Sequence, residues 1–264
     1  MGNQPIDDGN YLFSEEERNE FLKLEPKAAP YFRKWYGSQE FIAQKPRYCL
    51  WLGDCPAVEL AKLPECRKRI EAVRAYRAAS KRAATRKLAD RPRRFQTENM
   101  PAGPSILIPK VSSEKRLYVP MGFMSPDDFC SDAAFLIPNA TLYHFGVLTS
   151  SVHMAWMRAI CGRLEMRYRY SINLVYNNFP WPENADEKLQ KQIETAAEKI
   201  LKAREAEAGA SLATLYNDAI MPDDLRAAHK ANDKLVMKAY GFRPDMNEAE
   251  VVGELLKMYK KKIN

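Results

Sequence analysis

The chain has 264 residues, of which 46% are apolar and 28% are charged, and its formal net charge is +7. This composition fits a globular protein of one or two domains. The longest apolar stretch, residues 149–164, includes His153, Arg158 and Arg163. It falls short of the roughly 20 apolar residues that cross a bilayer, and the polar N-terminus lacks a secretory signal, so we expect no membrane partner.

The first predicted elements are a helix after Ser14, a strand at residues 47–52 and a helix beginning at Pro64. Ser14 and Glu17 form a capping box, with a buried side of Phe21, Leu22 and Leu24. The run RYCLWL is apolar enough for a buried strand. The helix from Pro64 has a narrow apolar stripe, and we expect it to end before Pro92. The stripe comprises Cys66, Ile70 and Val73, continued by Ala79, Ala83 and Ala84.

This helical region holds most of the excess charge. Residues 67–94 contain twelve Lys or Arg and two acids, a net +10, whereas the rest of the chain sums to −3. Arg67, Arg74 and Lys81 recur every seven residues and therefore share one face. Such concentration favours a polyanionic partner, most commonly DNA or RNA. A solvated helix face, or a face that pairs with acids of another domain, is the alternative.

Residues 100–146 are predicted to be rich in strands. Residues 105–111 and 116–121 resemble a hairpin around residues 112–115, and residues 134–137 and 141–145 resemble a second pair turning at Pro138–Asn139. A helix capped by Thr149 and Ser150 is expected to run to about Leu164, followed by a strand at residues 172–176.

After the loop at residues 177–182 the chain is predicted to be helical. Apolar spacing predicts one helix that stops at Gly209, a short one around Leu212, one that begins at Pro222 and closes at Gly241, and a last one ending in three lysines. We therefore predict an α+β fold: a mixed, β-rich domain with helices over residues 1–180, followed by a small all-helical C-terminal domain over residues 181–264.

Catalytic motifs are absent from the sequence. There is no G-x-G pair and no GxxxxGK[ST], so neither a dinucleotide loop nor a Gly-rich S-adenosylmethionine loop is present. The three histidines, His144, His153 and His229, share no ligand spacing and are expected to be structural, so no metal site is predicted. The five cysteines lack a CxxC pair and are expected to be buried free thiols.

Three stretches resemble a known family. They are QPIDDGNYLF at 4–13 with RYCLWL at 47–52; residues 108–182, from IPKVSSEKRLYVPMGF through TLYHFGVLTSSVHMAWMRAICGRLEMRYRYS to VYNNFPWP; and LYNDAIMPDDLRAAHKANDKLVMKAYGF at 215–242. Together they resemble the C-terminal part of MmeI-type restriction–modification enzymes and related bacterial adenine-specific DNA methyltransferases.

The resemblance implies that this chain is part of a longer polypeptide whose domains have different activities. In this family an upstream domain uses S-adenosylmethionine to methylate adenine N6, and some members also carry a nuclease. This chain resembles the target recognition domain and the helical domain that follow, with its first residues as a linker from the methyltransferase domain. The resemblance thus implies that the partners of this chain are double-stranded DNA and the methyltransferase domain. It implies that S-adenosylmethionine binds the parent enzyme, that this chain has no cofactor and that this chain alone is inactive. It also implies a location in the bacterial cytoplasm.

A recognition domain must hold DNA phosphates and read base edges. For the phosphates we expect residues of the basic segment, namely Arg67, Arg74, Arg77, Lys81, Arg82, Arg93 and Arg94. For the bases we expect the polar turn of the first hairpin, because Arg or Lys can contact guanine and Glu can accept from cytosine; its candidates are Lys110, Ser112, Ser113, Glu114, Lys115 and Arg116. Weaker candidates are Arg163, Arg167 and Arg169, whose interleaved tyrosines also suit a seam between domains.

Two other functions remain open at this point. The chain could be a stand-alone, non-enzymatic nucleic-acid-binding protein. It could also be a scaffold whose basic helix docks on an acidic protein.

Overall fold

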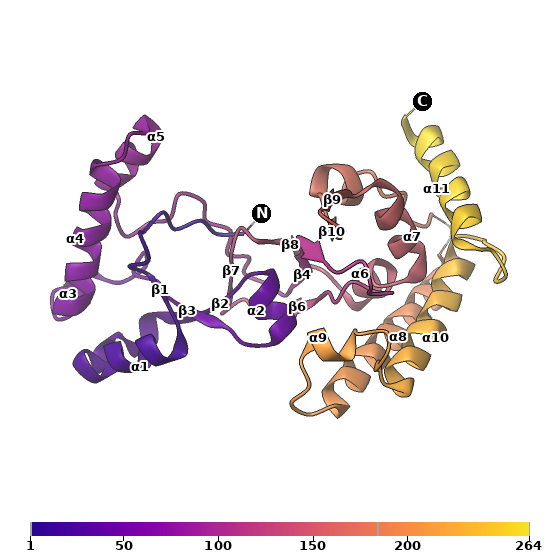
Figure 1. Ribbon diagram of the computed structural model, residues 1–264, viewed down its shortest axis with the longest axis horizontal. Helices are drawn as coiled ribbons and strands as arrows, with labels where there is room; N and C mark the ends of the chain where they lie inside the picture. The colour runs from indigo at the N-terminus through magenta and orange to yellow at the C-terminus, as the bar shows by residue number, and fades with distance from the viewer. Residues whose placement is uncertain (1, 184, 264) are drawn as a thin grey trace. The chain divides into compact units, whose positions relative to one another are not determined.

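The computed structural model describes residues 2–183 and 185–263, which divide into two compact units. Unit 1 comprises Met1–Phe41, Lys45–Gly103 and Met124–Leu136, and unit 2 comprises Ile42–Gln44, Pro104–Phe123 and Ile137–Asn264. The ribbon and its labels are shown in Figure 1. The predicted α+β class is confirmed.

Unit 1 is built around a four-stranded sheet of order β1-β3-β2-β7. Antiparallel pairing places Leu12 opposite Cys49 and Phe32 opposite Leu50, whereas β2 and β7 run parallel. The elements that contribute to this part of the chain are β1 (Leu12–Phe13), α1 (Glu15–Leu24), η1 (Pro26–Tyr31), β2 (Phe32–Tyr36), α2 (Ser38–Ala43), β3 (Arg47–Leu50), α3 (Ala57–Leu60), α4 (Pro64–Ala78), α5 (Ala83–Arg86), η2 (Lys87–Asp90) and β7 (Phe129–Cys130).

Local signals place most of these elements where we predict them. The capping box of Ser14 and Glu17 begins α1, and Pro64 is the first residue of α4. The predicted strand at residues 47–52 is β3. Leu24 is wrongly predicted as buried: it is 74% exposed, because it lies at the end of α1, beyond the face occupied by Phe21.

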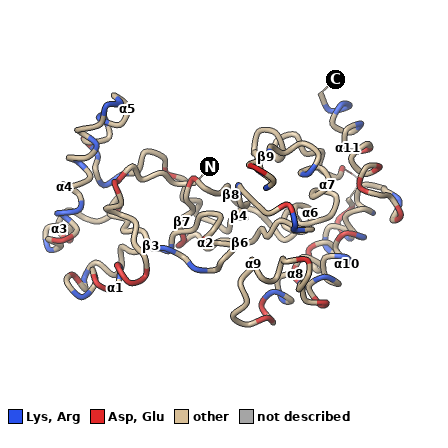
Figure 2. Tube along the Cα trace, in the orientation of Figure 1, with Lys and Arg blue, Asp and Glu red and all other residues tan. Residues whose placement is uncertain are grey.

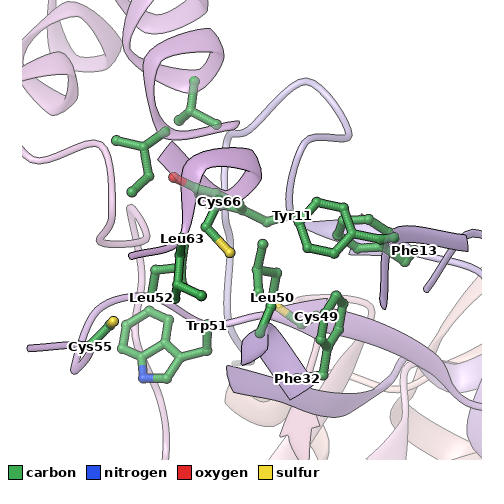
Figure 3. Packing of buried hydrophobic residues seen from close by; sticks show 14 of the residues in the cluster. Tyr11, Phe13, Phe32, Cys49, Leu50, Trp51, Leu52, Cys55, Leu63 and Cys66 are labelled. Carbon is green, nitrogen blue, oxygen red and sulfur yellow. The ribbon is translucent and has the colours of Figure 1, made fainter. Parts of the chain in front are cut away.

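The core of unit 1 combines aromatic rings with Leu and Cys side chains (Figure 3). The rings of Phe13, Phe21 and Phe32 meet edge to face, with centroids 5.2–5.9 Å apart, a favourable arrangement for aromatic pairs. A second set of such contacts joins Trp51, Phe95 and the Phe129 ring of β7. All five cysteines are free, four of them buried, and burial raises the pKa of the Cys49 thiol well above its usual value.

The predicted single helix from Pro64 to Pro92 is instead interrupted: the 15-residue α4 is followed by two single turns, α5 and η2. After α4 ends, the chain folds back so that the carbonyls of Leu88 and Arg91 reach the Arg77 guanidinium at 3.0 and 3.1 Å. Ala79, Ala83 and Ala84, predicted to continue the buried stripe, are consequently exposed.

Two three-stranded sheets lie later in the chain, of order β6-β4-β8 and β5-β10-β9. Their strands are β4 (Ser105–Pro109), β5 (Val111–Ser112), β6 (Gly122–Met124), β8 (Ala134–Pro138), β9 (Gly162–Leu164) and β10 (Arg167–Arg169). The predicted hairpin of residues 105–111 with 116–121 is wrong, because residues 116–121 form no strand. Their groups bind helices instead: Tyr118 donates to Asp233 at 2.7 Å, and the Val119 N–H donates to the Met154 sulfur.

Two further predicted strands are helical turns. Residues 141–145 belong to α6 (Leu142–Leu148), because the Thr141 side chain accepts from the His144 N–H and caps the helix. Gly146 within α6 lets this helix approach α8 (Glu187–Ala206), since a Cβ there would lie 2.6 Å from the Ile193 side chain. Residues 172–176 form a single π turn, η3 (Ile172–Tyr176), capped by the Ser171 side chain.

The remaining helices of unit 2 match the predicted segments. They are α7 (Ser151–Ile160), α8 (Glu187–Ala206), α9 (Leu212–Leu215), α10 (Asp223–Ala239) and α11 (Glu248–Ile263). Ser150 caps α7. The helix ends at Ile160, four residues before the predicted end, because the chain becomes extended at Cys161 and strand β9 begins at Gly162. Gly209 and Gly241 both have positive φ, as expected where helices stop.

Candidate nucleic-acid interface

The Lys and Arg residues of the basic segment lie along α4, α5 and the neighbouring residues of unit 1, where the tube in Figure 2 is blue, and most of them are exposed. Arg67 and Arg74 are both exposed on α4, as their seven-residue spacing predicts. Arg74 contacts Glu71 at 3.2 Å, an ion pair that is open to solvent on both sides. Exposed pairs of this kind are weak and leave the arginine available to a stronger anion.

A groove of about 810 Å³ runs beside this surface. Residues of α4 line one side, and the segment 90–94 lines the other, over an apolar base that includes Ile70 and Pro92. Two carboxylates, Glu71 and Asp90, stand among six cations: Arg67, Lys68, Arg74, Arg91, Arg93 and Arg94. Charge of one sign over low-dielectric walls concentrates the field, so this groove suits a polyanion.

The prediction that Arg77 binds phosphate is wrong, because its side chain is fully buried. Arg77 has a structural role instead. Its guanidinium donates five hydrogen bonds of 2.7–3.1 Å to backbone carbonyls, those of Pro5, Ile6, Leu88, Arg91 and Arg94. No N–H is left for a ligand, since an arginine has five. Arg77 continues the helical spacing of Cys66, Ile70 and Val73, the other buried residues of α4. This spacing is the sequence signal that could have predicted its burial.

The other predicted phosphate-binding residues differ in solvent exposure and in the protein groups that they already contact. Lys81 and Arg82 are exposed between α4 and α5. Arg93 is half-buried and donates to the Cys55 carbonyl at 3.0 Å. Arg94 is held between Asp54 and Glu98, with its guanidinium 5.1 Å from the Trp51 ring centroid, so its charge is largely matched within unit 1.

The predicted base-reading turn lies in unit 2 and is only partly open. Lys115 is exposed, and Lys110, Ser113, Glu114 and Arg116 are partly buried. Ser112 is 4% exposed, and its hydroxyl accepts from Arg116 at 3.4 Å. Ser112 therefore supports the turn instead of presenting its hydroxyl to solvent.

The structure brings this turn beside the weaker candidates. Strand β5 pairs with β10, which places Ser112 opposite Tyr168 and Val111 opposite Arg169. Arg163, Arg167 and Arg169 are exposed, whereas Tyr168 and Tyr170 alternate with them as buried residues. The interleaved tyrosines thus anchor a cationic hairpin, the β9–β10 hairpin, next to the turn. Sequence reasoning missed this juxtaposition, because β5 and β10 are far apart in the chain.

A buried pair fixes the end of this hairpin. The Tyr170 hydroxyl and Nε2 of His153 are hydrogen-bonded at 3.0 Å, and both side chains are buried. The Tyr170 N–H also donates to the Lys110 carbonyl at 2.8 Å. Burial lowers the pKa of His153 to about 3, so its imidazole is neutral at physiological pH.

The other histidines also have structural neighbours. His144 caps α6 with Thr141, and Nε2 of His229 lies 2.8 Å from the Tyr216 hydroxyl, under a stacked Tyr118 ring. Across residues 2–183 and 185–263, no three His, Cys, Asp or Glu side chains are grouped as metal ligands. Within the same residues, no helix has the length and hydropathy needed to cross a membrane.

Comparison with known proteins adds two family matches. The family model described as MmeI, target recognition domain, matches residues 1–183, and the model described as MmeI, C-terminal domain, matches residues 185–264.

Two individual relatives are similar over almost the whole chain. DNA methyltransferase A of Bacillus subtilis (strain 168) is 39% identical over 259 residues, which is 98% of this chain and 29% of that protein. A solved structure of the type IIL restriction–modification enzyme MmeI in complex with DNA has a TM-score of 0.95 and 42% identity, over 99% of this chain and 35% of that chain. The chain therefore spans about a third of the length of each relative.

Proposed function

We propose that this chain, which belongs to the MmeI family through both its target recognition domain and its C-terminal domain, binds duplex DNA. We further propose that it selects the target sequence of a bacterial adenine-specific DNA methyltransferase or restriction–modification enzyme. The observation that carries the proposal is the cationic groove along α4, where six cations face two carboxylates. Neutralising phosphates is the main source of sequence-independent affinity for DNA.

We assign the target recognition domain to residues 1–180 and the helical domain to residues 181–264. The family boundary between residues 183 and 185 supports this division. The loop before α8 also supports it, because it contains Pro180 and Pro182 and precedes a continuous series of helices.

The two units suit different parts of recognition. In unit 1 we assign the main phosphate contacts to the exposed Arg67, Arg74, Lys81 and Arg82, and lesser contacts to Arg93 and Arg94, which already have partners within the unit. In unit 2 we assign base reading to the turn of Lys110, Ser113, Glu114, Lys115 and Arg116, supported by Ser112, together with the adjoining β9–β10 hairpin. A two-stranded ribbon fits the major groove, where Arg and Lys contact guanine and Glu accepts from cytosine.

The remaining partners follow from the parent enzyme. We propose that a methyltransferase domain of the same polypeptide binds S-adenosylmethionine and transfers the methyl group to adenine N6 in the bacterial cytoplasm. This chain contributes no cofactor site, and methyl transfer by the isolated chain would contradict the assignment. The similarity to DNA methyltransferase A supports this placement.

The test is fluorescence anisotropy of the 264-residue chain with a labelled random-sequence duplex across a salt series. A variant with Arg67, Arg74 and Lys81 changed to Glu should bind weakly, and its salt slope should fall by about 0.9 per lost phosphate contact. The matched control reverses three exposed lysines elsewhere, Lys23, Lys202 and Lys257. Equal loss in both variants would mean that net charge, and not the groove, holds the DNA.

A further inference from the structure

The tip of the β9–β10 hairpin presents apolar side chains to solvent. Two residues, Glu165 and Met166, join the strands, and Met166 is 72% exposed. Leu164, beside the tip, is 41% exposed and pairs across the hairpin with Arg167. Isolated exposed apolar residues are common, but here two of them lie at the end of one hairpin.

The backbone at this tip is held in a disfavoured conformation. Glu165 has φ +56°, in the left-handed region that non-glycine residues rarely occupy. Its carboxylate contacts Arg167 at 2.9 Å, and the Arg163 guanidinium donates to the Met166 carbonyl at 3.3 Å. Arg163 in turn lies 4.1 Å from the centroid of the buried Tyr168 ring. The exposed position of Met166 is therefore held by contacts from both strands.

The surroundings of the tip indicate what it contacts. Three exposed arginines, Arg163, Arg167 and Arg169, flank it against one acid, Glu165. Cations beside an apolar tip match a DNA duplex, in which phosphates flank stacked bases. Proteins that deform DNA use the same combination, with a Leu, Ile, Met or Phe side chain inserted between base steps.

We propose that Met166 is a wedge: when the chain binds DNA, its side chain enters between neighbouring base pairs and unstacks them. This inference rests on the proposed function, since it needs DNA at the β9–β10 hairpin. It adds a deformation of the duplex to the reading of base edges, and so makes recognition depend on how easily a given base step unstacks.

The experiment uses a duplex enriched from a random library by binding to the 264-residue chain, with 2-aminopurine placed at each adenine in turn. Emission from this base rises when it is unstacked. With the wild-type chain we expect a rise at one base step. Met166→Ala should lose that rise, and Met166→Leu should retain it. The matched control is Ile220→Ala, which shortens a side chain that is 59% exposed and lies outside the hairpin.

Anisotropy of the same samples distinguishes loss of base unstacking from loss of DNA binding. Saturated binding without any emission change, or with a change that Met166→Ala leaves intact, overturns the wedge and leaves the proposed function standing. Failure to enrich or bind any duplex overturns the proposed function itself, and the wedge with it.

Discussion

The backbone N–H of Cys66 donates to the buried carboxylate of Glu25 at 2.8 Å, although 41 residues separate them. The same carboxylate accepts from the Glu65 N–H at 3.1 Å. Leu63, the residue before α4, offers no side-chain acceptor. Helix α4 is therefore capped by Glu25, the residue between α1 and η1, which satisfies two N–H groups at its N-terminus.

Glu25→Ala should lower the free energy of unfolding by about 0.5–2 kcal/mol, the usual cost of losing a helix cap. Chemical denaturation monitored by circular dichroism measures it. The control is Glu20→Ala, which removes only an exposed ion pair with Lys23 and should cost at most about 0.5 kcal/mol. Equal effects of the two changes would refute the capping role.

Arg77→Met should destabilise the chain strongly, by about 3 kcal/mol or more, because five carbonyls lose their common donor. Thermal unfolding compared with Arg74→Met provides the measurement. Arg74 is exposed on the same helix, so its replacement should leave stability within about 0.5 kcal/mol and weaken DNA binding instead. A well-folded Arg77→Met chain would show that the segment 88–94 is held by other contacts.

Tyr170→Phe removes the buried hydroxyl that meets His153, at an expected cost of about 1–3 kcal/mol. Because this pair fixes the end of β10, we expect discrimination between enriched and random duplexes to fall more than binding to the random duplex. Competition anisotropy gives both values. Tyr143→Phe, at a half-buried position on α6, is the control. A parallel loss of affinity for both duplexes would count against a positioning role.

The buried His153 should contribute a loss of stability in mild acid. Its pKa is about 3 in the folded chain and near 6.5 when unfolded, so the unfolded state binds the extra proton between these values. Below pH 6.5 this contributes a loss of up to about 1.4 kcal/mol per pH unit. The raised pKa of Asp233, caused mainly by burial, acts in the opposite direction, since the folded state then holds the proton more tightly.

The measurement is therefore the difference between wild type and His153→Gln from pH 7 to pH 5. The variant lacks the titrating imidazole and should lose less stability over that range. Identical pH profiles would show that His153 does not stay neutral in the folded chain.

Local signals in the sequence were sufficient where an element carries its own cap or stripe. Ser14 and Glu17 define the start of α1, and the spacing of Cys66, Ile70 and Val73 defines the buried side of α4. Thr141 was a cap of the same kind, but the aromatic run after it favoured a strand. In the structure the cap begins α6, and Gly146 permits the close approach of this helix to α8.

The remaining errors concern partners that lie far away in the chain. Residues 116–121 have the composition of a strand, yet Tyr118 is bound to Asp233, 115 residues later. Arg77 carries a charge that normally signals a surface position, but folding collects carbonyls from two distant segments around it. The groove beside α4 depends on the same packing of the segment 88–94 around Arg77. The sequence therefore locates the positive charge but does not predict the shape of the groove.

The bonds from Arg77 to Pro5 and Ile6 also set the limits of any module exchange. Asn3 adds to them by donating to the Cys130 carbonyl and bridging to Ser131. A chimaera that transplants only the basic helices would leave behind the acceptors that hold them, and one joined after residue 6 would remove two of the five. Any transplant of the basic helices therefore has to carry residues 3–6 and the segment 88–94, together with β7.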